Sequence, residues 1–272
     1  MNPQMNLQTL SPTQLVATCY VRPMRGGAQS HMLIASDGNA YVVKFANNPQ
    51  SPRVLVNEWL ACSIGRALGL TIPEPAILSV PEEFVERDPS LVIRLANSTV
   101  KCSPGPAFGS RIISGLGVVD YLPESALHKV ENLDEFAGVL ALDKWLCNSD
   151  GRQAVFCRKR AFRAHFIDFG YCFNADEWSF PDSALRGLYA HRLVYSGICG
   201  WESFEPWLSR IETFSFSTLQ AIAAEVPQEW ANPDALFQLL ERIDSRRSCV
   251  RKLIAGVHKS PQNPFGSWRQ EP

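Results

Sequence analysis

Two aspartates, Asp150 and Asp168, lie on either side of a stretch that predicts a short β-hairpin. Asp150 ends an Asn-Ser-Asp sequence that follows an apolar helical pattern, and Asp168 opens an Asp-Phe-Gly sequence after a β-like run. Because a hairpin brings its ends together, we expect both carboxylates to face one cleft. Phosphoryl transfer needs such a pair, since one carboxylate orients the attacking hydroxyl and another holds Mg²⁺ on the triphosphate. Taken singly, either aspartate is more often a turn or cap residue.

A lysine in an apolar strand, Lys44, is the second feature with potential chemistry. It stands late in the strand predicted over residues 40–45, which follows a strand, a glycine-containing loop, another strand and a turn. Kinase-like folds place a lysine in this way against the phosphates of ATP. Glu58, in the helix predicted over residues 53–68, would hold Lys44 as a fixed cation. The structural alternative is that Lys44 is a solvent-facing strand residue and Glu58 lies on a solvated helix face.

Composition indicates a globular protein and argues against several functions. The chain has 272 residues, of which 46% are hydrophobic and 19% are charged, and this argues against disorder. Its net charge of −1 gives no support for a nucleic-acid-binding or anionic-membrane surface. We find no apolar run long enough to span a bilayer and no signal peptide, so a cytoplasmic protein is expected. The eight scattered cysteines predict reduced, mostly buried thiols rather than disulfides or a zinc site.

Periodicity and turn residues predict the elements that position these side chains. Strands are predicted over residues 15–21, 32–35, 40–45, 91–95, 154–157 and 163–167, and extended chain entering a strand over 70–80. Helices are predicted over residues 53–68, 133–146, 183–198, 204–214, 217–226 (with Ser217 as N-cap) and 234–256. We expect residues 98–114 to form an irregular insert and residues 118–123 to form a connection between lobes. We expect residues 1–14 to form a loose or strand-adding terminus.

These elements predict an α+β, two-lobed protein-kinase-like fold with an antiparallel-sheet N-lobe and a mainly helical C-lobe. The N-lobe, with its glycine-rich phosphate loop, is placed at residues 1–121. The C-lobe, with the catalytic and metal loops, is placed at residues 122–257, and residues 258–272 are expected to form a loose tail.

Several stretches, in order, resemble the HipA-like kinase family, bacterial relatives of protein and phosphatidylinositol kinases. Residues 27–29 match its Gly-Ala-Gln phosphate loop, and residues 57–58 with 67–73 resemble its helix and the entry to the next strand. Residues 148–150 and 167–168 match its catalytic and metal loops. The resemblance covers roughly residues 16–173 and implies ATP and Mg²⁺ as cofactors.

The resemblance also implies a role for each candidate site residue. Asp150 would be the catalytic base, Asp168 would bind Mg²⁺, and Lys44 would contact the α- and β-phosphates. Residues 118–123 would offer backbone groups to the adenine ring. The nucleotide-binding set expected in this way is Gly26, Gly27, Ala28, Gln29, Lys44, Glu58, Val119 and Tyr121.

Three features depart from the family pattern. Kinases carry an Asn about five residues after the catalytic Asp as a second metal ligand, but Val155 stands at that spacing. Gln153 is the nearest amide, and it would be the second metal ligand if the loop is shorter. Met24 stands where toxin-type members have a serine that is autophosphorylated. Since the chain is too short for the toxin's extra N-terminal domain, we expect a stand-alone HipA-like kinase domain, for which no antitoxin partner is implied.

Three functions stay open at this point. The first is an ATP-dependent phosphotransferase with a protein Ser/Thr hydroxyl as acceptor, which motif order and spacing favour. The second is a small-molecule kinase, whose pocket the insert at residues 98–114 would shape. The third is a non-catalytic nucleotide-binding pseudokinase, which the missing Asn suggests. The sequence does not identify the acceptor.

Overall fold

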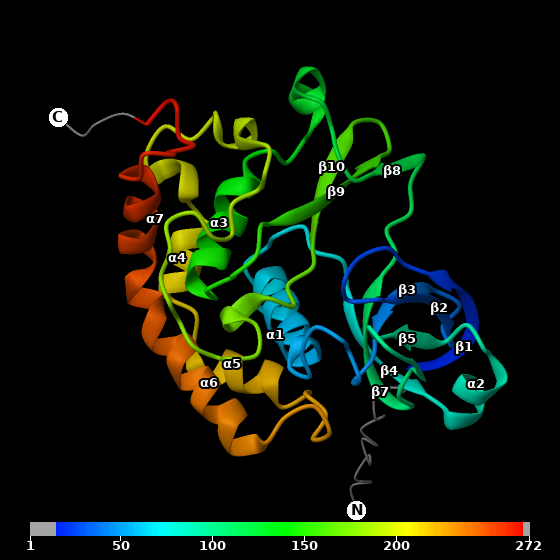
Figure 1. Ribbon diagram of the computed structural model, residues 1–272. Coiled ribbons are helices and arrows are strands. Elements are labelled where there is room, and N and C mark those ends of the chain that lie inside the picture. Colours follow the sequence, from blue (N-terminus) through cyan, green and yellow to red (C-terminus); the bar gives the residue numbers. More distant parts are fainter. Residues whose placement is uncertain (1–14, 269–272) are drawn as a thin grey trace, which may run out of the picture.

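A closed five-stranded barrel forms one side of the molecule in the computed structural model, which describes residues 15–268 (Figure 1). The strands are β1 (Leu15–Pro23), β2 (His31–Ala35), β3 (Ala40–Lys44), β4 (Pro75–Val80), β5 (Val92–Arg94), β6 (Thr99–Lys101), β7 (Gly105–Arg111), β8 (Gly117–Val119), β9 (Gln153–Arg158) and β10 (Phe162–Ile167). The barrel has the order β1-β2-β3-β7-β4. Its neighbours are antiparallel except β1 and β4, which pair in parallel and close the barrel. The expected antiparallel sheet therefore needs correction at this one pair.

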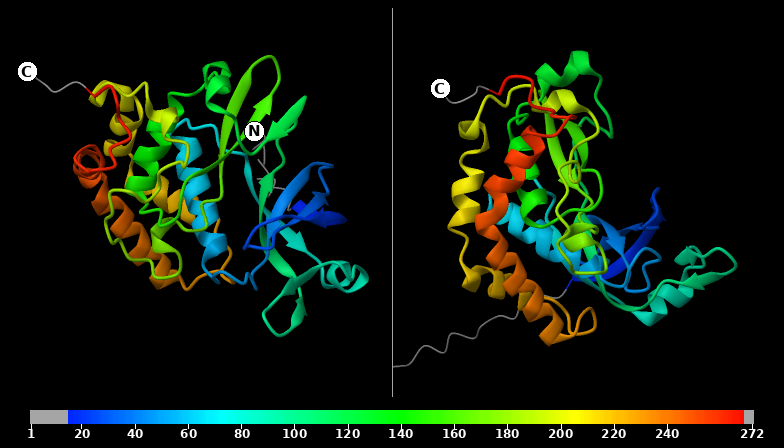
Figure 2. Two further views of the ribbon diagram at one scale, coloured as in Figure 1. Left: turned by 45° about the horizontal axis from the view of Figure 1, so that its top comes forward. Right: turned by 60° about the vertical axis from the view of Figure 1, so that its left-hand side comes forward.

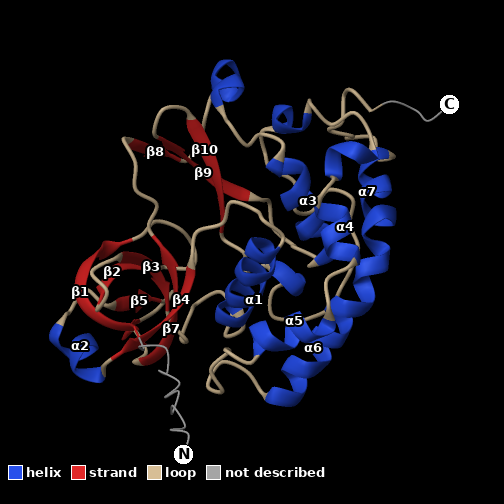
Figure 3. Cartoon of the chain, turned by 180° about the vertical axis from the view of Figure 1, so that it is seen from behind, coloured by secondary structure: helices blue, strands red, loops and turns tan. Residues whose placement is uncertain are grey.

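Helices other than α2 form the other side of the molecule, and α1 lies between them and the barrel (Figures 1 and 3). The α-helices are α1 (Val54–Ala67), α2 (Glu82–Arg87), α3 (Glu135–Trp145), α4 (Trp207–Glu212), α5 (Phe216–Ala223), α6 (Pro233–Arg246) and α7 (Val250–His258). Short 3-10 helices are η1 (Glu124–Lys129), η2 (Cys172–Asn174), η3 (Arg192–Tyr195), η4 (Trp201–Phe204) and η5 (Arg247–Cys249). Among the helices of the described chain, none combines the length and the apolar composition that a membrane crossing needs.

Two hydrophobic clusters hold the structure together. One fills the barrel, where strands such as β4 alternate buried and half-buried residues with the period of two that one-sided burial requires. The other joins α1 to α3 and the later helices. Helix α1 is buried on nearly every face, and most of its buried residues are apolar. A Cβ at its Gly65 would lie 2.9 Å from Leu142 of α3, so the two helices pack closely.

A three-stranded sheet, β10-β9-β8, links the barrel side to the helical side. β9 and β10 form the hairpin predicted from the sequence, with His165 opposite Val155. β8, from the expected connection between lobes, pairs with β9. The domain boundary at residue 121 stays a prediction, since β8 precedes it and β9 follows it.

The segment expected to be an irregular insert instead contains β6 and β7, and β7 lies between β3 and β4 in the barrel. Its prolines and glycines predicted a loop, but one glycine serves packing. A Cβ at Gly109 would lie 2.3 Å from Leu78 Cδ1 and 3.3 Å from Tyr41 Cδ1. Only glycine, which lacks a side chain, therefore fits at this position of strand β7.

An excursion between β4 and β7 carries α2 and the β5–β6 hairpin. Figure 2 shows this segment projecting from the barrel. The sequence predicted β5 but neither α2 nor β6.

The last third of the chain differs most from expectation. Residues 183–198 form only the short η3, because carbonyls of Ser183, Ala184 and Arg186 accept hydrogen bonds from Lys144 Nζ instead of a helical N–H. The N-cap of helix α5 is Ser215, two residues before the predicted Ser217. Of the helix predicted over 204–214, only α4 is α-helical, since η4 ends at residue 204, and the helix predicted over 234–256 is divided into α6, η5 and α7.

The expected loose tail is wrong for residues 258–268. Phe265 is buried and Trp268 packs on the same hydrophobic cluster, with ring centroids 5.4 Å apart. Residues 1–14, predicted as a loose or strand-adding terminus, and residues 269–272, predicted as part of the loose tail, lie outside the described residues. All eight cysteines are free thiols, and five of them are buried.

Candidate active site

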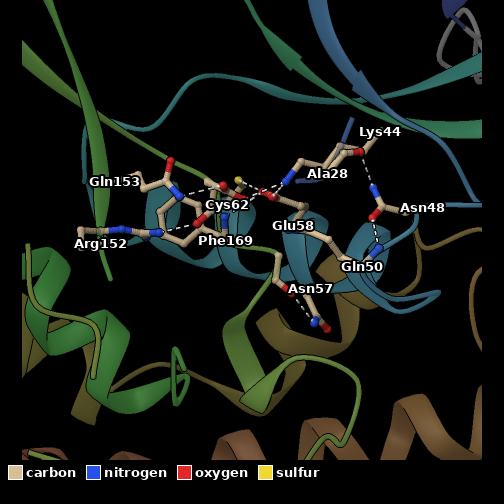
Figure 4. Close-up of polar contacts among 12 residues, drawn as sticks. Ala28, Lys44, Asn48, Gln50, Asn57, Glu58, Cys62, Arg152, Gln153 and Phe169 are labelled. Atoms are coloured by element: carbon tan, nitrogen blue, oxygen red, sulfur yellow. Dashed lines mark hydrogen bonds and ion pairs between the residues drawn. The ribbon is translucent and has the colours of Figure 1, made fainter. Parts of the chain in front are cut away.

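A buried lysine between two carboxylates forms the centre of the candidate site (Figure 4). Lys44 comes from the end of β3, Glu58 from the second turn of α1, and Asp168 from the loop after β10. Lys44 Nζ donates to Glu58 Oε1 and, over 2.8 Å, to Asp168 Oδ1. Lys44 and Glu58 are buried, whereas the Asp168 side chain keeps 31% of its surface exposed. One cation between two carboxylates leaves one net negative charge, and its open side is at Asp168.

Charge coupling within this group follows from burial and proximity. Burial disfavours the charged form of Lys44, but the charges of Glu58 and Asp168 outweigh it and hold the pKa of Lys44 above its ordinary value. Burial also opposes ionisation of Asp168, yet Lys44 holds the pKa of Asp168 below its ordinary value. Burial raises the pKa of Glu58 against the pull of Lys44. Glu58 accepts hydrogen bonds from Lys44 and from the Phe169 N–H at 3.1 Å, and both contacts stabilise its ionised form.

The loop after β10 is held in a specific backbone conformation. Asp168 has φ +61°, in the left-handed region that side-chain-bearing residues rarely adopt. Glu58 fixes the next N–H, at Phe169, and Asn57 Nδ2 donates to the Gly170 carbonyl at 2.8 Å. Two consecutive residues of α1 therefore fasten this loop.

Gln153, at the start of β9, lies beside Asp168. Its Nε2 donates to Asp168 Oδ2 at 3.0 Å, and the Gln153 side chain is exposed. The structure thus brings the two predicted metal ligands together. No group of three or more His, Cys, Asp or Glu side chains within residues 15–268 is arranged to hold a metal ion. One carboxylate and one amide oxygen fit Mg²⁺, which takes one or two protein carboxylates and completes its shell with phosphate oxygens and water.

Asp150 occupies an exposed loop that is joined to the Asp168 loop. Its Oδ1 accepts the Gly151 N–H at 2.7 Å, and its own N–H donates to Asn148 Oδ1 at 3.1 Å. Within the described chain its Oδ2 makes no hydrogen bond, so this oxygen can accept one from a hydroxyl. The N–H of Ser149 donates to the carbonyl of Tyr171 at 3.0 Å, which ties the two loops together.

The predicted phosphate loop lies between β1 and β2. Gly26 has φ +118°, a conformation that favours glycine. Asn48 Nδ2, from the loop after β3, donates to the Ala28 carbonyl at 3.1 Å. A Cβ at Gly27 would come within 2.9 Å of Gln50 Nε2, so the backbone passes close to this neighbouring loop.

Gln29 uses its side-chain amide within the protein. Its Nε2 donates to the Arg94 carbonyl at 2.7 Å, and its Oε1 accepts the Arg94 N–H at 2.8 Å. The amide therefore pairs with β5 as a neighbouring strand would, and it fastens the phosphate loop to the β5–β6 hairpin. A direct contact of this amide with nucleotide stays a prediction.

Val119 and Tyr121 lie apart from the lysine-centred group. Both are exposed, Val119 pairs with Phe156 of β9, and the Tyr121 ring stacks on His191 with centroids 5.8 Å apart. Among the described residues, neither makes a hydrogen bond to Lys44 or Asp168. Their contact with adenine stays a prediction.

Sequence reasoning missed two buried charges, Asp143 on α3 and Arg152 beside Gln153. Both side chains are fully buried, and Arg152 Nη2 donates to the Asp168 carbonyl. Burial raises the pKa of Asp143 to about 6 against the opposing charge of Arg152. In the sequence, Asp143 lies in an apolar helical pattern and Arg152 follows Asp150 by two residues, and neither position marks a charged residue as functional.

Comparison with known proteins supports a kinase fold. The proinflammatory kinase CtkA of Helicobacter pylori is 16% identical with a TM-score of 0.57, over 88% of this chain and 95% of that chain. A Golgi casein kinase is 11% identical with a TM-score of 0.51, over 90% and 74% of the two chains. At these identities the likeness shows the fold alone, which is α+β and kinase-like. A search of curated proteins gives no match.

A family model matches most of the chain, a much longer stretch than any single motif covers. The family model described as HipA-like kinase matches residues 18–255, from β1 into α7. This range contains the lysine-centred group and both loops that carry the candidate aspartates. The chain therefore belongs to the family of HipA-like kinases.

Proposed function

We propose that the chain is an ATP-dependent phosphotransferase that transfers the γ-phosphate of ATP to a Ser or Thr hydroxyl of a protein. The observation that carries this proposal is the assembly of Lys44, Glu58, Asp168 and Gln153 from four separate elements into one hydrogen-bonded group. Membership of a kinase family and the kinase-like fold support the same class of reaction.

In this proposal each residue has a distinct task. Lys44, held by Glu58, presents a fixed positive charge to the phosphates. Asp168 and Gln153 would hold Mg²⁺, which when bound compensates the negative charge of the phosphates. Asp150 accepts a hydrogen bond from the acceptor hydroxyl through its unused oxygen and orients it for attack. Preorganised charge of this kind is where catalysis of phosphoryl transfer mainly arises.

The phosphate loop would hold the nucleotide through its backbone. Its conformation is set from two sides, by Asn48 and by the Gln29–Arg94 pair. Val119 and Tyr121 would contribute backbone contacts to the adenine ring.

The test is transfer from ATP labelled at the γ-phosphate, in Mg²⁺, to the protein itself and to a mixed protein substrate. The proposal predicts labelled phosphoserine or phosphothreonine after acid hydrolysis, and none when EDTA replaces Mg²⁺. Labelled small molecules with unlabelled protein would point to a small-molecule acceptor. Mg²⁺-dependent ATP binding without any transfer would indicate a pseudokinase and contradict the proposal.

A further inference from the structure

We propose that Arg152, anchored by Asp143, is a positioning residue that couples the Asp150 loop to the conformation of Asp168. It deepens the function proposed above and rests on it for the assignment of Asp168 to Mg²⁺. The proposal starts from a chain of contacts through one carboxylate oxygen, Asp143 Oδ1.

Asp143 Oδ1 receives contacts from both sides of the Asp150 loop. Asn148 Nδ2 donates to it at 2.9 Å, and Arg152 Nη1 lies 3.5 Å from it. Asn148 in turn accepts the Asp150 N–H at 3.1 Å. The loop that carries Asp150 is therefore fixed at both ends to one atom of α3.

Arg152 connects Asp143 to the loop that contains Asp168. Its Nη2 donates to the carbonyl of Asp168, and its guanidinium lies 3.9 Å above the Phe169 ring. Because Asp168 has φ +61°, its backbone needs outside contacts to stay in place. Glu58 supplies one at the Phe169 N–H, and Arg152 supplies the other at the preceding carbonyl.

Stability alone does not explain this buried pair. Asp143 Oδ2 and Arg152 Nε are buried without a hydrogen-bond partner within residues 15–268, and the one contact between the side chains is long. The attraction within such a pair offsets little of the free energy that removing both charges from water costs. Apolar residues in place of the pair are often as stable. An apolar pair would make neither the hydrogen bond to Asn148 nor the hydrogen bond to the Asp168 carbonyl.

The test uses the double variant Asp143→Asn/Arg152→Met, which leaves no charge buried at this place and retains an acceptor for Asn148. The matched control is Arg246→Met. Arg246 also lies over a phenylalanine ring, 4.7 Å from that of Phe180, and it donates to the backbone carbonyls of Lys144 and Trp145. Both proteins are compared with the wild type by two measurements.

The first measurement is the ratio of the ATP Kd in EDTA to that in Mg²⁺, together with kcat and KM for transfer. We expect the double variant to lose about 10-fold or more of the tightening by Mg²⁺, and Arg246→Met to keep it. The second is hydrogen exchange at the Phe169 and Cys172 amides, which donate to Glu58 and to the Phe169 carbonyl. We expect both to exchange at least about 10-fold faster in the double variant only. Arg152→Lys, which keeps the charge but has a single ammonium, replaces the double variant if that protein does not fold.

The two measurements separate failure of this inference from failure of the proposed function. If wild-type protein shows no Mg²⁺-dependent binding, the proposed function fails, and amide exchange alone decides the positioning role. Wild-type exchange at both amides in the folded variant overturns the inference. So does an unchanged effect of Mg²⁺ in a protein whose wild type responds to Mg²⁺.

Discussion

Lys44 Nζ lies 2.8 Å from Asp168 Oδ1, although 124 residues separate the two in the chain. The contact joins the end of a barrel strand to the loop after the β9–β10 hairpin. It creates a compact group with one net negative charge, partly open to solvent at Asp168. In the proposed function this group holds the nucleotide and Mg²⁺, and its buried charges also affect stability, so changes to it give separable predictions.

Lys44→Met should lower the free energy of unfolding by roughly 3–5 kcal/mol, since it leaves Glu58 buried without its cation. The double variant Lys44→Met/Glu58→Gln should recover most of that loss, because no carboxylate then stays buried without a partner. Neither variant should transfer phosphate. Urea unfolding and the transfer assay are the measurements, and normal turnover by Lys44→Met would make Lys44 a strand residue only.

Gln153→Leu should raise the Mg²⁺ concentration for half-maximal transfer about 10-fold or more, the usual cost of losing a group that supports a metal ligand. The amide oxygen is removed and Asp168 loses its hydrogen bond from Nε2. Titration of Mg²⁺ at fixed ATP measures the effect. Gln220→Leu, at an exposed position of α5, is the control and should leave the titration unchanged. Identical curves for the two variants would remove Gln153 from the metal site.

His165 should make stability depend on pH between about 6.5 and 4. Burial, with the charges of Arg163 and Lys159, lowers the pKa of His165 to about 4 in the folded protein. The unfolded chain binds a proton at about pH 6.5, so stability present above that pH is lost as the pH falls through this window. His165→Val, matched to Val155 across the hairpin, should flatten that part of the profile. Urea unfolding at several pH values measures it, and an unchanged slope in His165→Val would refute it.

Gly109→Ala should destabilise the barrel by about 1–3 kcal/mol, the range for overpacking a core. Its new methyl group would meet Leu78 Cδ1 at 2.3 Å. Gly117→Ala is the matched control on β8, where a Cβ would meet nothing within 4 Å. Thermal unfolding of the two proteins compares them, and equal melting temperatures would contradict the packing of β7.

The sequence predicted the local features of this protein better than its long-range ones. The strands around the phosphate loop, helix α1 and the β9–β10 hairpin follow from periodicity within short windows. Lys44 and Glu58 could be paired because their spacing along a strand and a helix resembles a known family. The contact of Gln29 with Arg94 spans 65 residues and leaves no mark in either segment.

Two segments could not be predicted because contacts with residues distant in the sequence determine their structure. Strand β7 has a glycine at position 109 because Leu78 and Tyr41 leave no room for a side chain there. A local sequence pattern rich in glycine and proline cannot reveal these neighbours. Residues 183–198 have a helical composition, but Lys144 holds three of their carbonyls. In both cases tertiary contacts override local propensity.

The most direct test of the central claim compares Asp150→Asn with Asp168→Asn in two assays, a thermal-shift titration with Mg·ATP and transfer of labelled phosphate. Asp150→Asn should keep the wild-type thermal shift and lose transfer by ~10²–10⁴-fold, the usual contribution of an orienting or general-base group. Asp168→Asn should lose both the Mg²⁺-dependent shift and transfer, because charge compensation for the nucleotide is gone. Wild-type transfer by both variants would contradict the assignment of a kinase active site to these loops.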